Sequence, residues 1–353
     1  MNGRPTRRPA AAATRMAGLL IGAALVAGAA ACAAEPAGPS ASATPTPTYT
    51  SRYVAPAPGV IAPLSGELLP AGTALGPALT VKIDNHDDAR PPIALAAADI
   101  VFEELVEGGI TRYAAVFESE VPAEIGPVRS IRPMDPDIAV PFGGMIVYSG
   151  GQEQFVSMMM DTPVVNTVFD YDRQGLFYRQ DGRPSPHDVI VRAQEALALH
   201  PELVAPAQQF AFAASPATST AGVAGAPIAS MQLRFSDARY PSWTWDGGRG
   251  QFLRFQEGNA DVDSEGGQLG ATNVIAMMVG IDWSYAIVPR TVMVGSGEAW
   301  VATDGRLVHG TWSKESRDAP IRFVDDAGFP IFLAPGNTWV ELVPGGEGAF
   351  AAA

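Results

Sequence analysis

Asp84, Asn85 and His86 open the most polar run of the chain, which continues through two further aspartates to Arg90. The run follows an expected buried strand at residues 79–84, and α/β sheets present functional side chains where strands end. An imidazole beside carboxylates could serve as a general base or share a divalent metal ion. No second histidine stands at ligand spacing, so we predict no metal, and a turn held by Asx side chains explains the run equally well.

Glu103, Glu107 and Arg112 flank the turn of a predicted hairpin. Residues 100–107 and 112–118 read as strands on either side of Gly108-Gly109. Because side chains alternate along a strand, we expect Glu103 and Glu107 on one face. With Arg112 across the turn, these carboxylates could hold a cationic group, or they could form a cross-strand ion pair on a solvated face.

Arg129 and Arg132 lie in a glycine- and proline-flanked segment of a chain that is otherwise acidic. Two guanidinium groups at this spacing could clamp a carboxylate or a phosphate. For one of the two, internal neutralisation of Glu103 or Glu107 is the favoured alternative.

His187 follows Ser185-Pro186 and precedes a helix expected at residues 189–200, for which Asp188 or Ser185 reads as a cap. We keep it as a ligand-binding candidate. The chain has no nucleophile elbow, Walker loop, paired-cysteine motif or dinucleotide fingerprint. No motif therefore supports catalysis, and no cofactor is predicted.

Three short runs in the second half repeat an apolar-Arg-aromatic pattern around Arg234, Arg254 and Arg322. On strands, this pattern places each arginine on the face opposite its apolar neighbours. The three could line a groove for an anionic or glycan ligand, but a sheet with one solvated face gives the same pattern and is favoured.

The elements that must position these residues change character along the chain. Residues 64–212 mix strand signals, such as 145–148, with helical signals at 93–98, 154–160 and 189–200, which predicts an α/β-type domain. The uncharged residues 213–228 read as a linker. Residues 229–345 form short β-type runs, with a hairpin signal at Asp304-Gly305. We expect an α+β protein in which a mainly antiparallel all-β domain follows the α/β-type domain and a disordered tail occupies 346–353.

The N-terminus has the layout of an export signal. Four arginines precede an apolar run that ends in three alanines immediately before Cys32, the single cysteine of the chain. This arrangement resembles a bacterial lipobox, so residues 1–31 are a predicted lipoprotein signal peptide and Cys32 a predicted lipidation site. Residues 32–63, dominated by Ala, Pro, Ser and Thr, read as an extended tether.

The formal net charge is −14, and removal of the four signal arginines would make it more negative. Such a balance argues against nucleic acid as a partner and against adhesion to anionic lipid through a basic face. Because the N-terminus reads as a lipoprotein signal, we expect an extracytoplasmic protein, anchored to the outer face of the cell membrane by its N-terminal lipid. Its partner is expected to be an unknown envelope ligand or protein.

Long segments of the chain resemble the YerB-type lipoproteins, also called the DUF3048 family, whose function is not established. Residues 81–86 read Val-Lys-Ile-Asp-Asn-His and residues 125–133 read Ile-Gly-Pro-Val-Arg-Ser-Ile-Arg-Pro. The resemblance implies an envelope lipoprotein of two domains and supplies no catalytic residues. Further similar segments are 90–91, 99–103, 106–112, 186–187, 273–275, 294–297, 304–305, 310–314 and 335–339.

Ligand or partner binding is the leading functional hypothesis, because the chain combines a signal and a tether with the absence of a catalytic motif. The alternative is a hydrolase or transferase acting on a cell-wall polymer. In that enzyme His86 would be the base, Asp84 or Glu103 would orient it, and Arg129 or Arg132 would hold an anionic substrate. A third interpretation is that these polar groups only stabilise the fold.

Overall fold

The computed structural model describes residues 59–353. The predicted signal peptide, Cys32 and nearly all of the predicted tether lie outside these residues. Within them, no helix is both long and apolar enough to cross a membrane.

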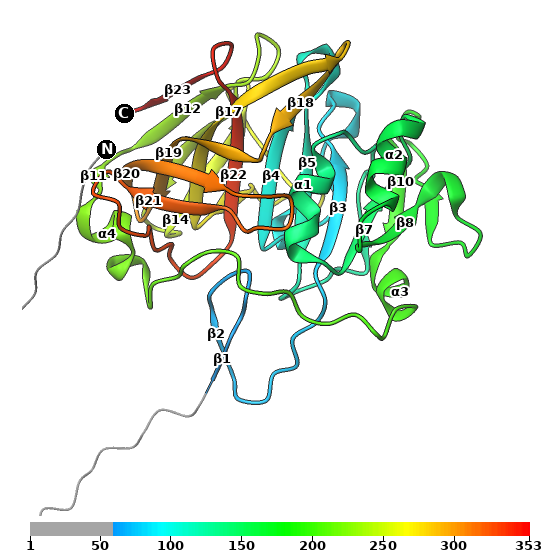
Figure 1. Cartoon of the computed structure of the whole chain (residues 1–353), viewed down its shortest axis with the longest axis horizontal. Coiled ribbons are helices and arrows are strands. Elements are labelled where there is room, and N and C mark those ends of the chain that lie inside the picture. The colour runs from blue at the N-terminus through cyan, green and yellow to red at the C-terminus, as the bar shows by residue number, and fades with distance from the viewer. Residues whose placement is uncertain (1–58) are drawn as a thin grey trace, which may run out of the picture. The chain divides into compact units, whose positions relative to one another are not determined.

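A large mixed sheet organises the described residues (Figure 1). Its strands, in order across the sheet, are β11 (Ala226–Pro227), β20 (Arg306–Lys314), β19 (Gly295–Thr303), β17 (Asn273–Tyr285), β22 (Thr338–Pro344), β4 (Ile100–Leu105), β5 (Thr111–Phe117), β3 (Leu79–Asp84), β7 (Met145–Tyr148) and β8 (Val165–Val168), with β18 (Val288–Val292) beside β17 and β21 (Arg322–Asp325) beside β20. The protein is thus mostly β, with several sheets.

The two halves of the chain meet inside this sheet. Strand β22, from the C-terminal half, pairs in parallel with β4, from the N-terminal half, with Val340 opposite Phe102. Figure 1 shows the red β22 directly beside the cyan β4. Backbone hydrogen bonds therefore run continuously from the segment expected to be α/β-type into the segment expected to be all β.

Smaller elements surround the large sheet. One small sheet contains β6 (Glu124–Ile125), β10 (Val189–Arg192) and β9 (Phe177–Arg179). Another contains β15 (Asn259–Ala260), β14 (Gln251–Gln256), β13 (Ser242–Asp246), β12 (Ser230–Arg234) and β23 (Ala349–Ala352), with β16 (Gly270–Ala271) beside β14. Strands β1 (Val60–Ile61) and β2 (Leu68–Leu69) form a separate hairpin. The α-helices are α1 (Asp135–Ala139), α2 (Glu153–Met160), α3 (Ala193–Ala198) and α4 (Thr220–Ala224).

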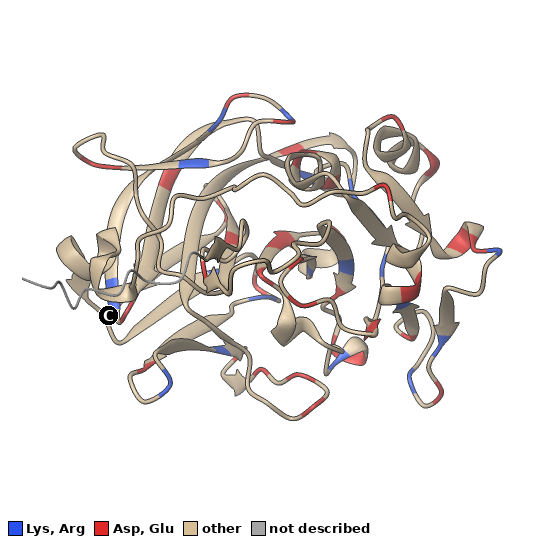
Figure 2. Ribbon diagram, turned by 90° about the horizontal axis from the view of Figure 1, so that it is seen from below, with Lys and Arg blue, Asp and Glu red and all other residues tan. Residues whose placement is uncertain are grey.

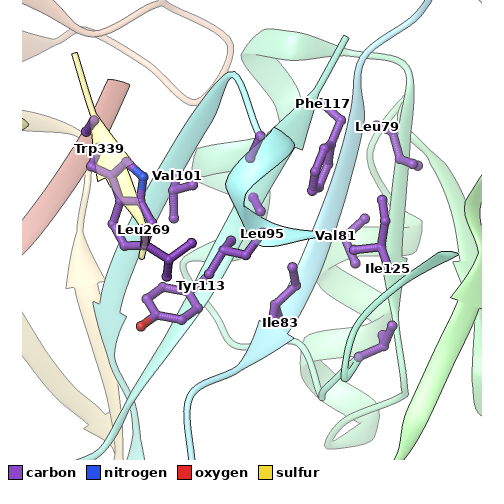
Figure 3. Packing of buried hydrophobic residues seen from close by; sticks show 14 of the residues in the cluster. Leu79, Val81, Ile83, Leu95, Val101, Tyr113, Phe117, Ile125, Leu269 and Trp339 are labelled. Atoms are coloured by element: carbon purple, nitrogen blue, oxygen red, sulfur yellow. The ribbon is translucent and has the colours of Figure 1, made fainter. Parts of the chain in front are cut away.

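Both faces of the large sheet are covered near its centre. Leu79, Val81 and Ile83 of β3 pack on one face with Leu95 and Ile125 (Figure 3). The opposite face is packed by a second buried group, which includes Ile100, Phe102, Ala114, Ile138 and Val340. Strands buried on both faces become nearly continuous apolar runs, so the charged side chains within β3, β4 and β5 stand out as exceptions.

Several expectations for local structure were wrong. The predicted helix at 189–200 is strand β10 followed by α3, because the β-branched run Val-Ile-Val at 189–191 favours a strand and pairs with β9 and β6. The helical signal at 93–98 yields only a 3₁₀ turn, Leu95–Ala97.

The segment predicted as a linker is also ordered, since residues 213–228 contain a 3₁₀ turn, α4 and β11. The tail predicted to be disordered contains β23, which pairs with β12. Small residues such as those of 349–352 have little intrinsic strand preference, so the open edge of β12 provides the pairing that their composition did not predict.

Candidate functional site

Strand alternation divides the candidate residues between two faces of the sheet. Asp84 and Arg112 are opposite each other on β3 and β5 and lie on one face, together with Lys82. Asn85 and Glu103 lie on the other, where the Asn85 amide reaches the Glu103 carboxylate at 3.2 Å. The candidates therefore form two sites rather than one.

The expectation that Glu103 and Glu107 share a face was wrong. Strand β4 ends at Leu105, and Glu107 begins a 3₁₀ turn that contains Gly108 at φ 72°. This turn breaks the two-residue period, so Glu107 joins the Arg112 side while Glu103 stays opposite.

The segment after Gly126 brings distant residues to the end of β3. The N–H of Asp84 donates to Pro127 O at 2.9 Å, the N–H of Arg129 to Lys82 O at 2.8 Å, and the N–H of Val128 to Val189 O at 2.6 Å. This segment is thus bonded to β3 on one side and to the start of β10 on the other. The stretch before β10 carries His187, so His187 and Arg129 both arrive at Asp84.

Asp84 is the hub of the first site. Its carboxylate lies 2.6 Å from His187 Nδ1 and 3.0 Å from Arg129 Nε, and it accepts a 3.1 Å hydrogen bond from the His86 backbone N–H. The residue is 2% exposed. A carboxylate this deeply buried requires such partners, because removing an ionised group from water is costly.

His86 occupies a different position from the predicted one. The carboxylate of Asp84 orients His187, whereas His86 stacks on His187 with ring centroids 4.3 Å apart and planes 17° from parallel. His86 Nδ1 accepts a hydrogen bond from the Asp88 N–H at 3.2 Å, which caps the following 3₁₀ turn. The run does form a turn, but its local acceptors are the side chains of Asp84 and His86 and not those of Asn85 and Asp87, as an Asx-rich turn would have required.

Arg112 and Arg132 lie next to this hub. Both donate to Ser130 O, at 2.8 Å and 3.4 Å respectively, and Arg132 Nε pairs with Glu107 at 2.7 Å. The internal neutralisation of Glu107 by one arginine was thus predicted correctly. Burial acts to raise the pKa of Glu107, but the hydrogen bond and charge of Arg132 outweigh it, and the pKa lies below the usual range.

Arg112 is held in an unfavourable setting for a cation. Burial, followed by the charges of Arg132 and Arg129, lowers its pKa to about 10. Among the described residues it forms no ion pair, and its buried Nε has no hydrogen-bond partner. We call Arg112, Arg129 and Arg132, together with Asp84 and Glu107, the basic cluster. Its three guanidinium groups exceed its two carboxylates.

The basic cluster is a local feature of an acidic protein. Figure 2 shows Lys and Arg interspersed with Asp and Glu along the ribbon. The cluster is reachable from solvent, since the side chains of Arg129 and Glu107 are 19% and 23% exposed. A site with these properties can accept an anion by charge-assisted hydrogen bonds.

A second ion group, not anticipated from sequence, lies beneath the cluster. Lys82 contacts Glu104 and lies 2.8 Å from Asp135, whose other oxygen accepts the Arg132 N–H. Burial, then the charge of Asp135, raises the pKa of Glu104 to about 7. In the sequence, Lys82 and Asp84 stand two positions apart in the otherwise largely apolar strand β3. This pair of charged residues was the available signal for the ion group.

On the opposite face, Arg254 sits among three carboxylates. It lies 2.7 Å from Glu103, 2.9 Å from Asp261 and 3.3 Å from Glu341, and all four side chains are almost completely buried. Burial, followed by the charge of Glu103, raises the pKa of Glu341 well above its usual range. Glu103 therefore belongs to a closed internal network.

Asn85 and Arg90 extend that network. Arg90 donates to the Asn85 side chain and pairs with Asp261, while the Asn85 amide donates to Thr111 Oγ1 at 2.7 Å. Arg90 also lines a cavity of 610 Å³ beside Arg239. The structure thus separates Asn85, Arg90 and Glu103 from the basic cluster.

The three arginines of the repeated pattern do not form a groove. Arg234 pairs with Asp237 at the surface, Arg322 is exposed, and Arg254 is fully buried between Trp339 and Trp243. The solvated-face interpretation was wrong for Arg254, because the face it occupies packs against the large sheet, where Glu103 and Glu341 supply its partners.

Comparison with known proteins agrees with this fold. Residues 64–203 match the family described as "Protein of unknown function (DUF3048) N-terminal domain", and residues 231–340 match its C-terminal domain. The YerB protein of Bacillus subtilis (strain 168), provisionally named a lipoprotein, is 35% identical over 111 residues, which are 31% of this chain and 33% of that protein. The sequence match thus spans about a third of the relative's length.

The crystal structure of the YerB protein from Bacillus subtilis superimposes with a TM-score of 0.72 and 22% identity, over 83% of this chain and 99% of that chain. At this identity the superposition establishes the fold alone. With both of its domains matched in order, the chain belongs to the DUF3048 family.

Proposed function

We propose that this chain is an exported, lipid-anchored protein of the cell envelope whose folded part binds an anionic ligand at the basic cluster. The observation that carries the binding proposal is Arg112, a buried guanidinium with no carboxylate partner among the described residues. Burying an unpaired cation is costly unless an anion completes the site.

The neighbouring arginines support the same conclusion. Arg129 and Arg132 crowd Arg112 with positive charge, although each also has a carboxylate of its own. A phosphate or carboxylate group placed beside them would offset the repulsion and accept hydrogen bonds from guanidinium forks. We therefore assign the ligand to envelope components that carry phosphate or carboxylate groups.

The envelope location rests on the N-terminal layout. A basic segment, an apolar run, Cys32 and a Pro-rich tether follow in the order that a lipoprotein requires, and a relative in the family is provisionally named a lipoprotein. The anchor would leave the folded part outside the cytoplasm, facing the envelope.

A hydrolase or transferase acting on a cell-wall polymer is the second candidate, and one observation favours it. Asp84 holds Nδ1 of His187, which leaves Nε2 as the nitrogen that could take a proton from a nucleophile. In this version the base is His187, Asp84 orients it, and Arg129 holds the anionic part of the substrate.

Calorimetric titration of the purified protein tests anion binding. Inorganic phosphate and succinate are the two probes, and they distinguish a phosphate ligand from a carboxylate ligand. Arg129→Gln and Arg132→Gln should each weaken binding about tenfold or more, the loss expected for one or two charge-assisted hydrogen bonds. Arg234→Gln is the matched control, because it removes a surface arginine that already pairs with an aspartate.

The binding proposal fails if neither anion binds, or if Arg129→Gln and Arg132→Gln both bind as the unmodified protein does. The enzyme alternative needs a further result. Purified cell-wall material should be turned over by the protein, and His187→Gln should abolish that turnover while anion binding persists.

A further inference from the structure

We propose that His86, Asp88 and His187 form a binding site for a divalent transition metal ion, with Zn²⁺ as the first candidate. His86 and Asp88 lie two positions apart and His187 lies about a hundred positions further along the chain, which is why no ligand spacing was visible in the sequence. Their side chains each offer one ligand atom, and these atoms lie within 4.8 Å of one another. Two imidazoles and a carboxylate are a donor set that suits zinc and its neighbours.

The ring of His187 is already prepared for such a role. Its Nδ1 lies 2.6 Å from Asp84 Oδ2, so the free ring nitrogen is Nε2. Metal-binding histidines characteristically give their second nitrogen to a carboxylate, which fixes the tautomer and makes the ligand nitrogen more basic. Asp84 would thus be a positioning residue of the site and not a ligand.

His86 and Asp88 supply the adjustable side of the site. His86 Nδ1 lies 3.6 Å from Asp88 Oδ2, and the two side chains are 37% and 57% exposed. The same nitrogen accepts the Asp88 N–H at 3.2 Å, so an ion bound through it would replace that hydrogen bond. Ligand atoms around a tetrahedral zinc lie about 3.4 Å apart, as bonds of about 2.0–2.1 Å require. The set must therefore contract on binding, and rotation of these two exposed side chains provides that movement without disturbing the core.

The charges near the site are compatible with a cation. The positive charge of Arg129 would repel a bound cation, because Arg129 pairs with the same Asp84 carboxylate as His187 and therefore lies close to the site. Asp84 and Asp88 offset that repulsion with two negative charges. Three protein ligands also leave at least one position on the ion for water or for a ligand atom, so an anion held by Arg129 could touch the metal as well.

The metal site goes beyond the proposed anion binding and does not depend on it. A tag-free preparation of the protein, stripped with EDTA, is titrated calorimetrically with ZnCl₂. One ion per chain is expected. His187→Gln and Asp88→Asn should each weaken binding by at least about tenfold, since even outer-shell changes cost about 10–100-fold. Co²⁺ should give the visible bands of a four-coordinate ion in the unmodified protein and lose them in the variants.

His309→Gln is the matched control. His309 Nδ1 also lies 2.7 Å from a carboxylate, that of Asp326, but outside this group, and its loss should leave binding unchanged. Asp88→Asn protects the test against misfolding, because the Asp88 side chain is largely exposed.

The inference is overturned if Zn²⁺ does not bind, if Asp88→Asn binds it as tightly as the unmodified protein, or if His309→Gln abolishes binding. Phosphate titration of the EDTA-stripped protein separates the two proposals. Anion binding without zinc binding would reject the metal alone, whereas zinc binding without binding of either phosphate or succinate would reject the anion site alone.

Discussion

Arg254→Met should destabilise the whole folded part, because Arg254 neutralises carboxylates from both halves of the chain. Glu103 lies in the N-terminal half, and Asp261 and Glu341 lie in the C-terminal half. Removing the guanidinium leaves three buried carboxylates without their common partner. Methionine is of similar length and apolar, so the change isolates the loss of charge from the loss of volume.

The expected magnitude follows from the burial of the group. Breaking a fully buried ion pair by removing one partner costs about 3–5 kcal/mol, and Arg254 is shared by three buried carboxyl groups, which places this case near the upper end. Domains have free energies of unfolding of about 5–15 kcal/mol, so the variant should be marginal at neutral pH. Orphaned carboxylates have raised pKa values, and a raised pKa favours the folded state at low pH. The deficit should therefore shrink between pH 8 and pH 5.

Urea unfolding followed by tryptophan fluorescence and circular dichroism measures this effect. Trp339 and Trp243, two of the six tryptophans of the chain, flank the guanidinium, so part of the fluorescence arises at the site. Combining Arg254→Met with Glu103→Gln should recover at least about 1 kcal/mol, because one uncompensated charge is removed. Arg234→Met, at the surface, should change stability by less than about 0.5 kcal/mol. A loss below about 1 kcal/mol for Arg254→Met would refute the reasoning.

Two further predictions concern pH and anchoring. Burial, then the charge of Asp99, raises the pKa of Glu118 to about 7 from a usual 4.5, so its contribution to stability is fully present below pH 4.5 and is lost as the pH rises through 7. Glu118→Gln should thus be more stable than the unmodified protein at pH 8 by roughly 1–2 kcal/mol, a value reduced for solvent screening, and equally stable at pH 4. Glu120→Gln is the exposed control. Thermal unfolding between pH 4 and pH 8 measures the effect, and a Glu118→Gln variant less stable than the unmodified protein at pH 8 would contradict it. Cys32→Ser should abolish incorporation of labelled palmitate in cells and release the protein from the membrane fraction, and continued labelling would reject the lipidation proposal.

Local patterns predicted the parts of the fold that depend on neighbours in sequence. The hairpin of β4 and β5 and the hairpin at Asp304-Gly305 both formed as expected. The pairing of β22 with β4 could not be anticipated, because more than 200 residues separate the strands and parallel pairing carries no turn signal. For the same reason, Arg254 looked like a surface residue until its partners on the large sheet were known.

The candidate site was anticipated residue by residue but not as an arrangement. The polar run at Asp84 and the arginine pair at Arg129 and Arg132 were recognised from composition. Their grouping depends on which face of the sheet each side chain occupies. Glu107 lies on the face opposite to the predicted one, because it belongs to the glycine-containing turn that follows β4. The contact between Asp84 and His187 spans 103 positions, and only the folded chain reveals it.

The most direct test of the central claim is a crystal structure of the protein soaked with inorganic phosphate. The account predicts a phosphate in the basic cluster, with its oxygens about 2.7–2.9 Å from guanidinium nitrogens of Arg129 and Arg132. Phosphate bound only elsewhere, with Arg129 still closed on Asp84 and Arg132 on Glu107, would contradict it.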